Sequence, residues 1–303
     1  MGTPEFAVPS LEMLIKSEHE IAAVVTRPDR PRGRGLELRP SPVKELVTGH
    51  GIKVLQPEKA RAPDFIKDVK KIAPELIVVV AFGQILTREL LEIPLNGCIN
   101  VHASLLPLYR GAAPINWAII NGERETGITT MLMDEGMDTG EILLQRSIPI
   151  SPDDTAGSLH DKLAPSGALL LMETLSLLKD GMLKPKKQDN PQASYAPLLK
   201  KDDGRINWSL SAEMILNRIR GMNPWPGAFT EYRGKSLKIL SADVADREGQ
   251  PGEILAVDRD TILVACARGS IEILEIQPSG KRRMTTPEFL RGHLVKQGDF
   301  FER

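Results

Sequence analysis

Residues 76–81 read LIVVVA, a continuous apolar run that is typical of a β-strand covered on both faces. Shorter strand-like and helical runs alternate on either side of it. They are residues 8–16 (helix), 20–26 (strand), 41–49 (helix), 53–55 (strand), 64–72 (helix), 87–91 (helix) and 98–102 (strand). Because such alternation is the pattern of βαβ units, it predicts an α/β fold with a doubly wound, Rossmann-like and mostly parallel sheet.

The first residues of the sequence have an unusual pattern. Residues 2–6 (GTPEF) resemble the turn between a strand and a helix, yet no strand precedes them. A doubly wound sheet normally opens with a strand that lies centrally. We therefore expect the first strand to be missing before Met1, and the alternative is a fold that begins with a helix.

The second half of the chain follows another pattern. Two strands are predicted at residues 127–134 and 141–150, and a helix capped by Asp154 or Thr155 follows them to about residue 179. A helix at 212–220 then precedes five short strands at regular spacing, which predict a small, OB-like β-barrel. These strands are FTEY (229–232), SLKILSA (236–242), GEILAV (252–257), TILVACA (261–267) and SIEILEI (270–276).

The predicted domains are therefore a catalytic domain at residues 1–182 and a C-terminal barrel at residues 202–303. Between them, residues 183–201 are rich in Lys, Pro and Gln, and we interpret them as an interdomain linker.

Composition narrows the class of protein. The 303 residues are 41% hydrophobic and carry 39 basic and 40 acidic side chains, which excludes a disordered chain and gives no hint of nucleic acid. Cys98 and Cys266 form neither a disulfide framework nor a metal motif. No apolar run reaches the ~18–20 residues that span a bilayer, and no signal peptide is recognisable. These features predict a cytoplasmic enzyme without a metal or a membrane partner. We expect a monomer, although no feature of the sequence determines the oligomeric state.

The most informative stretch for chemistry is CINVHASLLPLYRGAAP at residues 98–114. Asn100 and His102 stand two apart at the end of a strand, so their side chains share one face. An amide donor beside an imidazole suits acyl transfer, since one can stabilise an oxyanion and the other can move a proton. Asp138, in the turn EGMDTG, can pair with the imidazole. Each residue alone is also explained by a structural role: a turn for Asn100 or Asp138, and a satisfied core position for His102.

These residues together resemble a known family. Asn100-x-His102, the run SLLPxYRG at residues 104–111 and Asp138-x-Gly140 are similar to the signature of the folate-dependent formyltransferases. Further likeness lies in GTPEFAVPSL (2–11), VVVAFGQIL (78–86), DGRINWS (203–209) and NPWPG (223–227), so the resemblance covers nearly the whole chain. Its closest likeness is to members whose acceptor is the methionine carried by initiator tRNA.

The resemblance implies the reaction and its residues. The formyl group of 10-formyltetrahydrofolate would move to the α-amine of methionyl-initiator tRNA, with Asn100, His102 and Asp138 as catalytic residues and no metal. The folate would lie between the end of the apolar strand and the loop that follows His102. Its predicted contacts are Phe82, Gly83, Ser104, Leu105, Leu106 and Pro107; for Phe82, plain core packing is an equal alternative.

Charge distribution bears on the tRNA. Residues 1–182 hold 19 basic and 24 acidic side chains, whereas residues 183–303 hold 20 and 16. Residues 27–44 carry six basic and two acidic side chains in a stretch with Pro and Gly, which predicts an exposed loop. Arg32 and Arg34 there, with Lys281, Arg282 and Arg283 in the second domain, are the predicted tRNA contacts. A charged, solvated surface is the alternative for both sets.

Two other functions stay open at this level. One is a formyltransferase for a small amine, such as a nucleotide sugar or glycinamide ribonucleotide, which would share Asn100, His102 and Asp138. The other is a nucleic-acid-binding module whose first domain is inactive. The basic stretch at residues 29–35 argues against the first, and the complete set of three candidate catalytic residues argues against the second.

Overall fold

Two sheets, joined through the first residues of the chain, form the first part of the molecule. The computed structural model describes residues 1–32 and 37–302, and of Arg32 only the backbone. The larger sheet has the order β5 (Ile77–Val80), β6 (Cys98–His102), β8 (Glu125–Leu132) and β9 (Ile142–Pro149). β5 and β6 are parallel, and the two following pairs are antiparallel. The smaller sheet is the parallel pair β1 (Val24–Val25) and β4 (Val54–Leu55).

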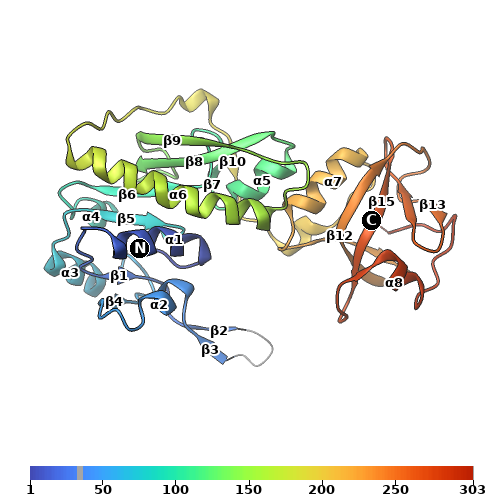
Figure 1. Cartoon of the computed structure of the whole chain (residues 1–303), viewed down its shortest axis with the longest axis horizontal. Coiled ribbons are helices and arrows are strands. Elements are labelled where there is room, and N and C mark those ends of the chain that lie inside the picture. The colour runs from blue at the N-terminus through green and yellow to red at the C-terminus, as the bar shows by residue number, and fades with distance from the viewer. Residues whose placement is uncertain (33–36, 303) are drawn as a thin grey trace. The chain divides into compact units, whose positions relative to one another are not determined.

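The remaining elements of this part surround the sheets (Figure 1). They are η1 (Glu5–Ala7), α1 (Val8–Lys16), β2 (Arg30–Arg32), β3 (Glu37–Arg39), α2 (Pro42–Val47), α3 (Pro63–Ile72), α4 (Arg88–Leu91), β7 (Arg110–Gly111), α6 (Ala156–Lys179), η2 (Asn190–Gln192) and β10 (Tyr195–Ala196). Helix α5 (Pro114–Ile120) belongs, after its first residue, to the second part of the molecule. The α/β class predicted from the sequence is confirmed, and most predicted helices and strands lie within two residues of their predicted bounds.

Helix α6 lies across the larger sheet in Figure 1, and its sequence explains how closely it packs there. A Cβ atom at Gly167 would lie 3.1 Å from Val101 of β6, so a larger residue would push the helix outward. Thr174 of α6 and Thr130 of β8 share a buried hydrogen bond of 2.8 Å between their hydroxyls. This packing fixes β6, whose C-terminal end carries Asn100 and His102.

Two predictions about local structure are wrong. The strand expected at residues 20–26 is reduced to Val24 and Val25, because only these two residues pair with a neighbouring strand, β4. The loop expected at residues 27–44 contains the antiparallel pair β2 and β3, in which Arg30 pairs with Arg39. Residues 30, 31 and 37–39 are exposed as expected, and α2 lies within the helix predicted at residues 41–49.

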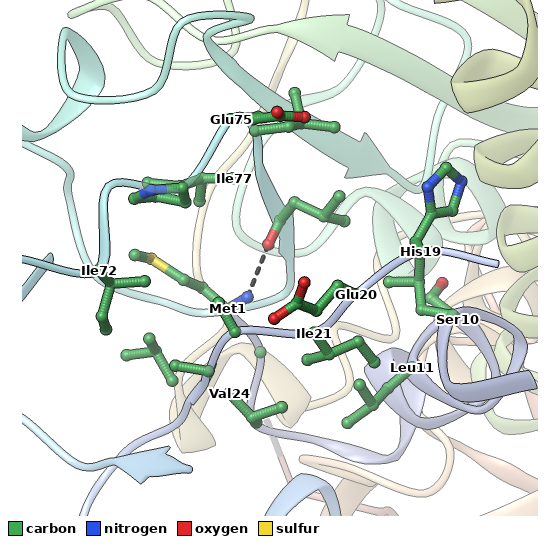
Figure 2. Close-up of a pocket in the computed structure, with 18 of the residues that line it drawn as sticks. Met1, Ser10, Leu11, His19, Glu20, Ile21, Val24, Ile72, Glu75 and Ile77 are labelled. Carbon is green, nitrogen blue, oxygen red and sulfur yellow. Dashed lines mark hydrogen bonds between the residues drawn. The ribbon is translucent and has the colours of Figure 1, made fainter. Parts of the chain in front are cut away.

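Met1 and Gly2 join the two sheets. The Gly2 N–H donates to the Val25 carbonyl at 2.9 Å, and the Met1 carbonyl accepts from the Val80 N–H at 2.9 Å. Met1 and Gly2 thus lie between the two sheets, bonded to β5 on one side and to β1 on the other. A cavity of about 860 Å³ adjoins them, lined by apolar side chains that include Leu11, Val24 and Ile77 (Figure 2).

The C-terminal part is an antiparallel sheet that closes on itself. Its order is β11 (Ala228–Tyr232), β12 (Lys235–Ala245), β15 (Ser270–Pro278), β14 (Ile262–Ala265) and β13 (Ile254–Val257), with β16 (Met284–Thr285) beside β15. The end of the chain connects the two edges, because Glu302 bridges to Glu231 and Phe300 bridges to Glu253. The five predicted strands are all present, together with η3 (Lys201–Gly204), α7 (Ala212–Gly221) and the unpredicted α8 (Thr286–Leu290).

The chain divides into two compact units. The first comprises Met1–Pro114, Glu125–Pro149 and His160–Pro197, and the second comprises Ile115–Arg124, Ile150–Leu159 and Leu198–Arg303. Most of the stretch predicted as a linker thus packs within the first unit. Its Tyr195 and Ala196 form β10, which pairs in parallel with Arg110 and Gly111 of β7.

Candidate active site

Asn100 and His102 lie at the C-terminal end of β6, as their spacing predicts. The pair shares one face of the strand, with the His102 ring buried and the Asn100 amide half-buried. Strand β6 is held between β5 and β8, so the two side chains project from a rigid element rather than from a loop.

Asp138 reaches the same place from the turn between β8 and β9. Its Oδ1 accepts a long hydrogen bond of 3.4 Å from Asn100 Nδ2, and its Oδ2 lies 3.7 Å from His102 Nδ1. The Gly111 N–H donates to Oδ2 at 2.8 Å. The structure therefore brings together the three residues that the sequence predicts as catalytic, although they are up to 38 positions apart.

The Asp138 backbone has an unusual conformation. Its φ is 53°, in the left-handed region that few residues other than glycine, asparagine and aspartate adopt readily. Such a conformation persists only where the surrounding contacts enforce it, and it often marks a functional site. Here it directs the carboxylate toward His102 and Asn100.

The contacts of His102 define the orientation of its ring. Nε2 lies 3.0 Å from the Tyr109 carbonyl oxygen, which can only accept, so Nε2 carries a proton in this contact. Nδ1 faces the carboxylate of Asp138. Since both neighbours are acceptors, the surroundings suit an imidazole that donates on either side.

The Asn100 amide has different surroundings. Within the part of the chain that the structure describes, its Nδ2 makes one long contact, with Asp138, and the side chain is not fully covered. An amide nitrogen carries two hydrogens, so one stays available for an oxygen of a bound molecule. Of the three residues, Asn100 is the best placed to donate to a developing oxyanion without first giving up a protein contact.

The loop after His102 presents a mixture of buried and accessible groups. Ser104 is buried, and its Oγ donates to the Leu108 carbonyl at 2.6 Å. Leu106 packs on Met131 and Ile142, whereas Leu105 is only half-buried. Of the predicted folate contacts here, Leu105 and Pro107 can offer side-chain surface. The Ser104 carbonyl accepts from Thr129 Oγ1, and the Leu106 N–H and carbonyl bond to the side chains of Thr129 and Gln145.

Phe82 and Gly83 follow strand β5 and have different surroundings. The Phe82 side chain is 1% exposed and belongs to a core cluster with Phe65, Leu86 and Leu90. Core packing, the alternative weighed above, thus describes this side chain. Gly83 is exposed, and its carbonyl accepts a hydrogen bond from the Arg27 guanidinium, a contact that the sequence does not reveal.

The predicted tRNA contacts are only partly described. Arg34 lies outside the described residues, as does the side chain of Arg32. In the second unit, Arg282 pairs with Glu288 and Arg283 with Glu275 on the surface, so both guanidinium groups already have partners. Lys281 is exposed and has no carboxylate partner among the described residues.

Three groups at the site are missed by sequence reasoning. The Gly111 N–H and the Tyr109 carbonyl act through the backbone, for which residue type gives no signal. The third is Gln188, which contacts the Asp138 turn from the predicted linker. A glutamine in a polar, proline-rich stretch has no recognisable signature. The signal that could have found Gln188 is the position of this stretch, which follows the strands that carry the catalytic residues.

Metal and thiol chemistry find little support in the side chains. Within residues 1–32 and 37–302, no group of three or more His, Cys, Asp or Glu side chains could hold a metal ion. Burial raises the pKa of the Cys98 thiol to about 11 and that of Cys266 to about 12, so neither is a reactive thiolate at neutral pH. No helix in the described chain is long and apolar enough to cross a membrane.

Comparison with known proteins identifies the family. A family model described as Formyl transferase matches residues 1–175, and one described as Formyl transferase, C-terminal domain, matches residues 198–294. The chain therefore belongs to the formyl transferase family, as its motifs predict.

Two individual relatives and one solved structure are similar to this chain. The chain is 55% identical over 298 residues to the methionyl-tRNA formyltransferase of Geobacter sulfurreducens, covering 98% of this chain and 94% of that protein. It is also 55% identical over 301 residues to the methionyl-tRNA formyltransferase of Caldanaerobacter subterraneus, covering 98% and 97%. Among solved structures, the sugar 3N-formyl transferase WlaRD superposes with a TM-score of 0.68 at 22% identity, covering 93% of this chain and 97% of that one. At that identity the likeness concerns the fold.

Proposed function

We propose that this chain transfers the formyl group of 10-formyltetrahydrofolate to the α-amine of methionyl-initiator tRNA, giving N-formylmethionyl-tRNA. The observation that carries the proposal is the convergence of Asn100, His102 and Asp138 in a chain that is 55% identical to a methionyl-tRNA formyltransferase over nearly its full length. We propose a separate role for each of these three residues.

Asn100 stabilises the charge that develops in the reaction. When the amine attacks the formyl carbon, negative charge gathers on the formyl oxygen, and the available hydrogen of Asn100 Nδ2 donates to it. Because this donor is fixed on β6, little reorganisation is needed as the charge develops. The half-exposed position of Asn100 leaves room for that oxygen.

His102 and Asp138 assist the proton transfers of the reaction. The attacking amine loses a proton as the new C–N bond forms, and the folate nitrogen gains one as it leaves. Asp138 Oδ2, 3.7 Å from His102 Nδ1, keeps the ring oriented and stabilises positive charge on it. In this reading His102 exchanges its contact with the Tyr109 carbonyl for one with the substrates during turnover.

The residues around the cluster fit a folate. A pterin needs hydrogen bonds from a planar edge and an apolar wall, the mixture typical of small-molecule sites. The half-buried side chains of Leu105 and Pro107 in the 104–107 loop supply the apolar wall. Phe82 contributes through its backbone, since its side chain lies in the core.

Acceptor choice rests on relatives and on charge. Both relatives named above are methionyl-tRNA formyltransferases, and a small amine would not need the basic residues 27–44 or Lys281. We also infer that the chain works as a monomer in the cytoplasm, in keeping with its two free, buried cysteines.

The acceptor can be tested by direct competition. Purified protein and 10-formyltetrahydrofolate are incubated with methionyl-initiator tRNA, with a dTDP-linked amino sugar, or with both, and formylated products are measured by mass spectrometry. We expect formylation of the tRNA-borne methionine at least 100-fold faster than of the sugar amine. Faster formylation of the sugar would overturn the choice of acceptor while leaving the chemistry intact.

Binding of the tRNA should depend strongly on salt. Phosphate contacts release counterions, so affinity falls steeply as salt concentration rises. Between 50 and 200 mM KCl we expect the Kd for initiator tRNA to rise at least ~10-fold, whereas the KM for the folate changes little. Filter binding across a salt series measures this, and Lys281→Ala should lower the slope. A Kd that stays constant across the series would contradict a phosphate footprint.

A further inference from the structure

Gln188 contacts the turn that carries Asp138. Its Nε2 donates to the main-chain oxygens of Asp138 at 2.8 Å and Gly140 at 2.7 Å. Both amide hydrogens are thus used on the two carbonyls that flank Thr139. Hydrogen bonds to both sides of one residue restrain the turn far more than a single contact would.

The other end of the same amide is held by Arg110. Gln188 Oε1 accepts from Arg110 Nε at 3.0 Å and from Nη2 at 2.7 Å. Arg110 is buried, and its Nη2 also donates to Asn190 Oδ1 at 2.7 Å. In the described chain no carboxylate forms an ion pair with Arg110. Because a guanidinium can only donate, it fixes which end of the Gln188 amide is oxygen.

The turn needs such support for two reasons. Asp138 has a φ of 53°, which costs conformational energy in a residue other than glycine. Gly140 lies so close to β8 that a Cβ atom there would be 1.7 Å from the Leu132 carbonyl oxygen. The turn is therefore confined by β8 on one side and by Gln188 on the other.

The carboxylate of Asp138 is held by the same stretch of chain. Its Oδ2 accepts from the Gly111 N–H, and Gly111 pairs with Ala196 in β10. The Arg110 N–H donates to the Ser194 carbonyl at 2.9 Å. Residues 188–196 thus anchor both parts of Asp138. Gln188 bonds to its backbone, and β10 holds its carboxylate indirectly, through the paired Gly111.

We propose that Gln188 is a positioning residue for the reaction: its amide donors hold the Asp138 turn so that the carboxylate faces His102. The inference rests on the proposed function for its kinetic readout. Residues 188–196, part of the stretch predicted as a linker, thus form a strap across the active site. Arg110 orients the Gln188 amide that holds the turn.

Two substitutions separate positioning from simple anchoring. Gln188→Met keeps the approximate size and removes every hydrogen bond. Gln188→Glu keeps an acceptor for Arg110, and adds charge to that contact, but removes both donors to the turn and sets a carboxylate against two carbonyls. If the donors matter, the glutamate variant fails in catalysis although its contact with Arg110 is retained.

We expect both variants to lower kcat at least 10-fold at saturating substrates, with both KM values within about 3-fold of wild type. We expect the Tm of Gln188→Glu to lie closer to wild type than that of Gln188→Met. Matched controls are Gln192→Met and Gln192→Glu. Gln192 is exposed on the same strap, and among the described residues its side chain bonds only to Asp189. Both controls should keep kcat within 2-fold of wild type.

A spectroscopic readout keeps the inference testable without turnover. The ¹⁵N signals of the His102 ring report its contacts, so displacement of Asp138 should shift them in Gln188→Glu and leave them unchanged in Gln192→Glu. Wild-type kcat in Gln188→Glu, or His102 signals identical to wild type, would overturn the positioning role. If the wild-type protein formylates no methionyl-tRNA, the proposed function fails, while the His102 spectrum still decides the role of Gln188.

Discussion

Replacing Asn100 with alanine should lower kcat for formyl transfer by about 10²–10³-fold, the usual effect of losing one fixed donor to an oxyanion. The reason is that Asn100 alone among the three polar residues has a hydrogen available without breaking a protein contact. The KM for the folate should change little, because the lost interaction forms mainly in the transition state. Single-turnover formylation with methionyl-initiator tRNA measures the effect.

A matched control and an isosteric variant make this result specific. Asn96→Ala removes an exposed amide elsewhere in the same unit and should leave kcat unchanged. Asn100→Asp keeps the size but sets a second carboxylate beside Asp138, so it should be at least as inactive as the alanine variant. A kcat within 3-fold of wild type for Asn100→Ala would remove Asn100 from the mechanism.

The sequence predicted the elements of this fold well, because its helices and strands have strong apolar patterns. The five strands of the barrel and helix α6 are examples in which local pattern and tertiary packing agree. Prediction failed for residues 20–26, where a good apolar run finds a partner strand only at Val24 and Val25. A strand requires a neighbour, and the neighbour is not encoded in the run itself.

The candidate site also contains some residues that the sequence predicts and others that it does not. Asn100 and His102 follow from the two-residue period of a strand, and Asp138 follows from its place in a turn together with the family motif. The hydrogen bonds from Gly111 and Gln188 do not, since they depend on how distant backbone segments meet. For Phe82 the sequence left folate contact and core packing equally open, and only the fold shows that its side chain points into the core.

We expect the cluster of Asn100, His102 and Asp138 to transfer a formyl group to the amine of a tRNA-borne methionine. The most direct measurement is a single-turnover reaction with [¹⁴C]formyl-labelled 10-formyltetrahydrofolate and methionyl-initiator tRNA, comparing wild type with Asp138→Asn. We predict stoichiometric label on the methionine for wild type and a rate at least 100-fold lower for the variant. No label on the tRNA with folded wild-type protein, or equal rates for both proteins, would contradict the account.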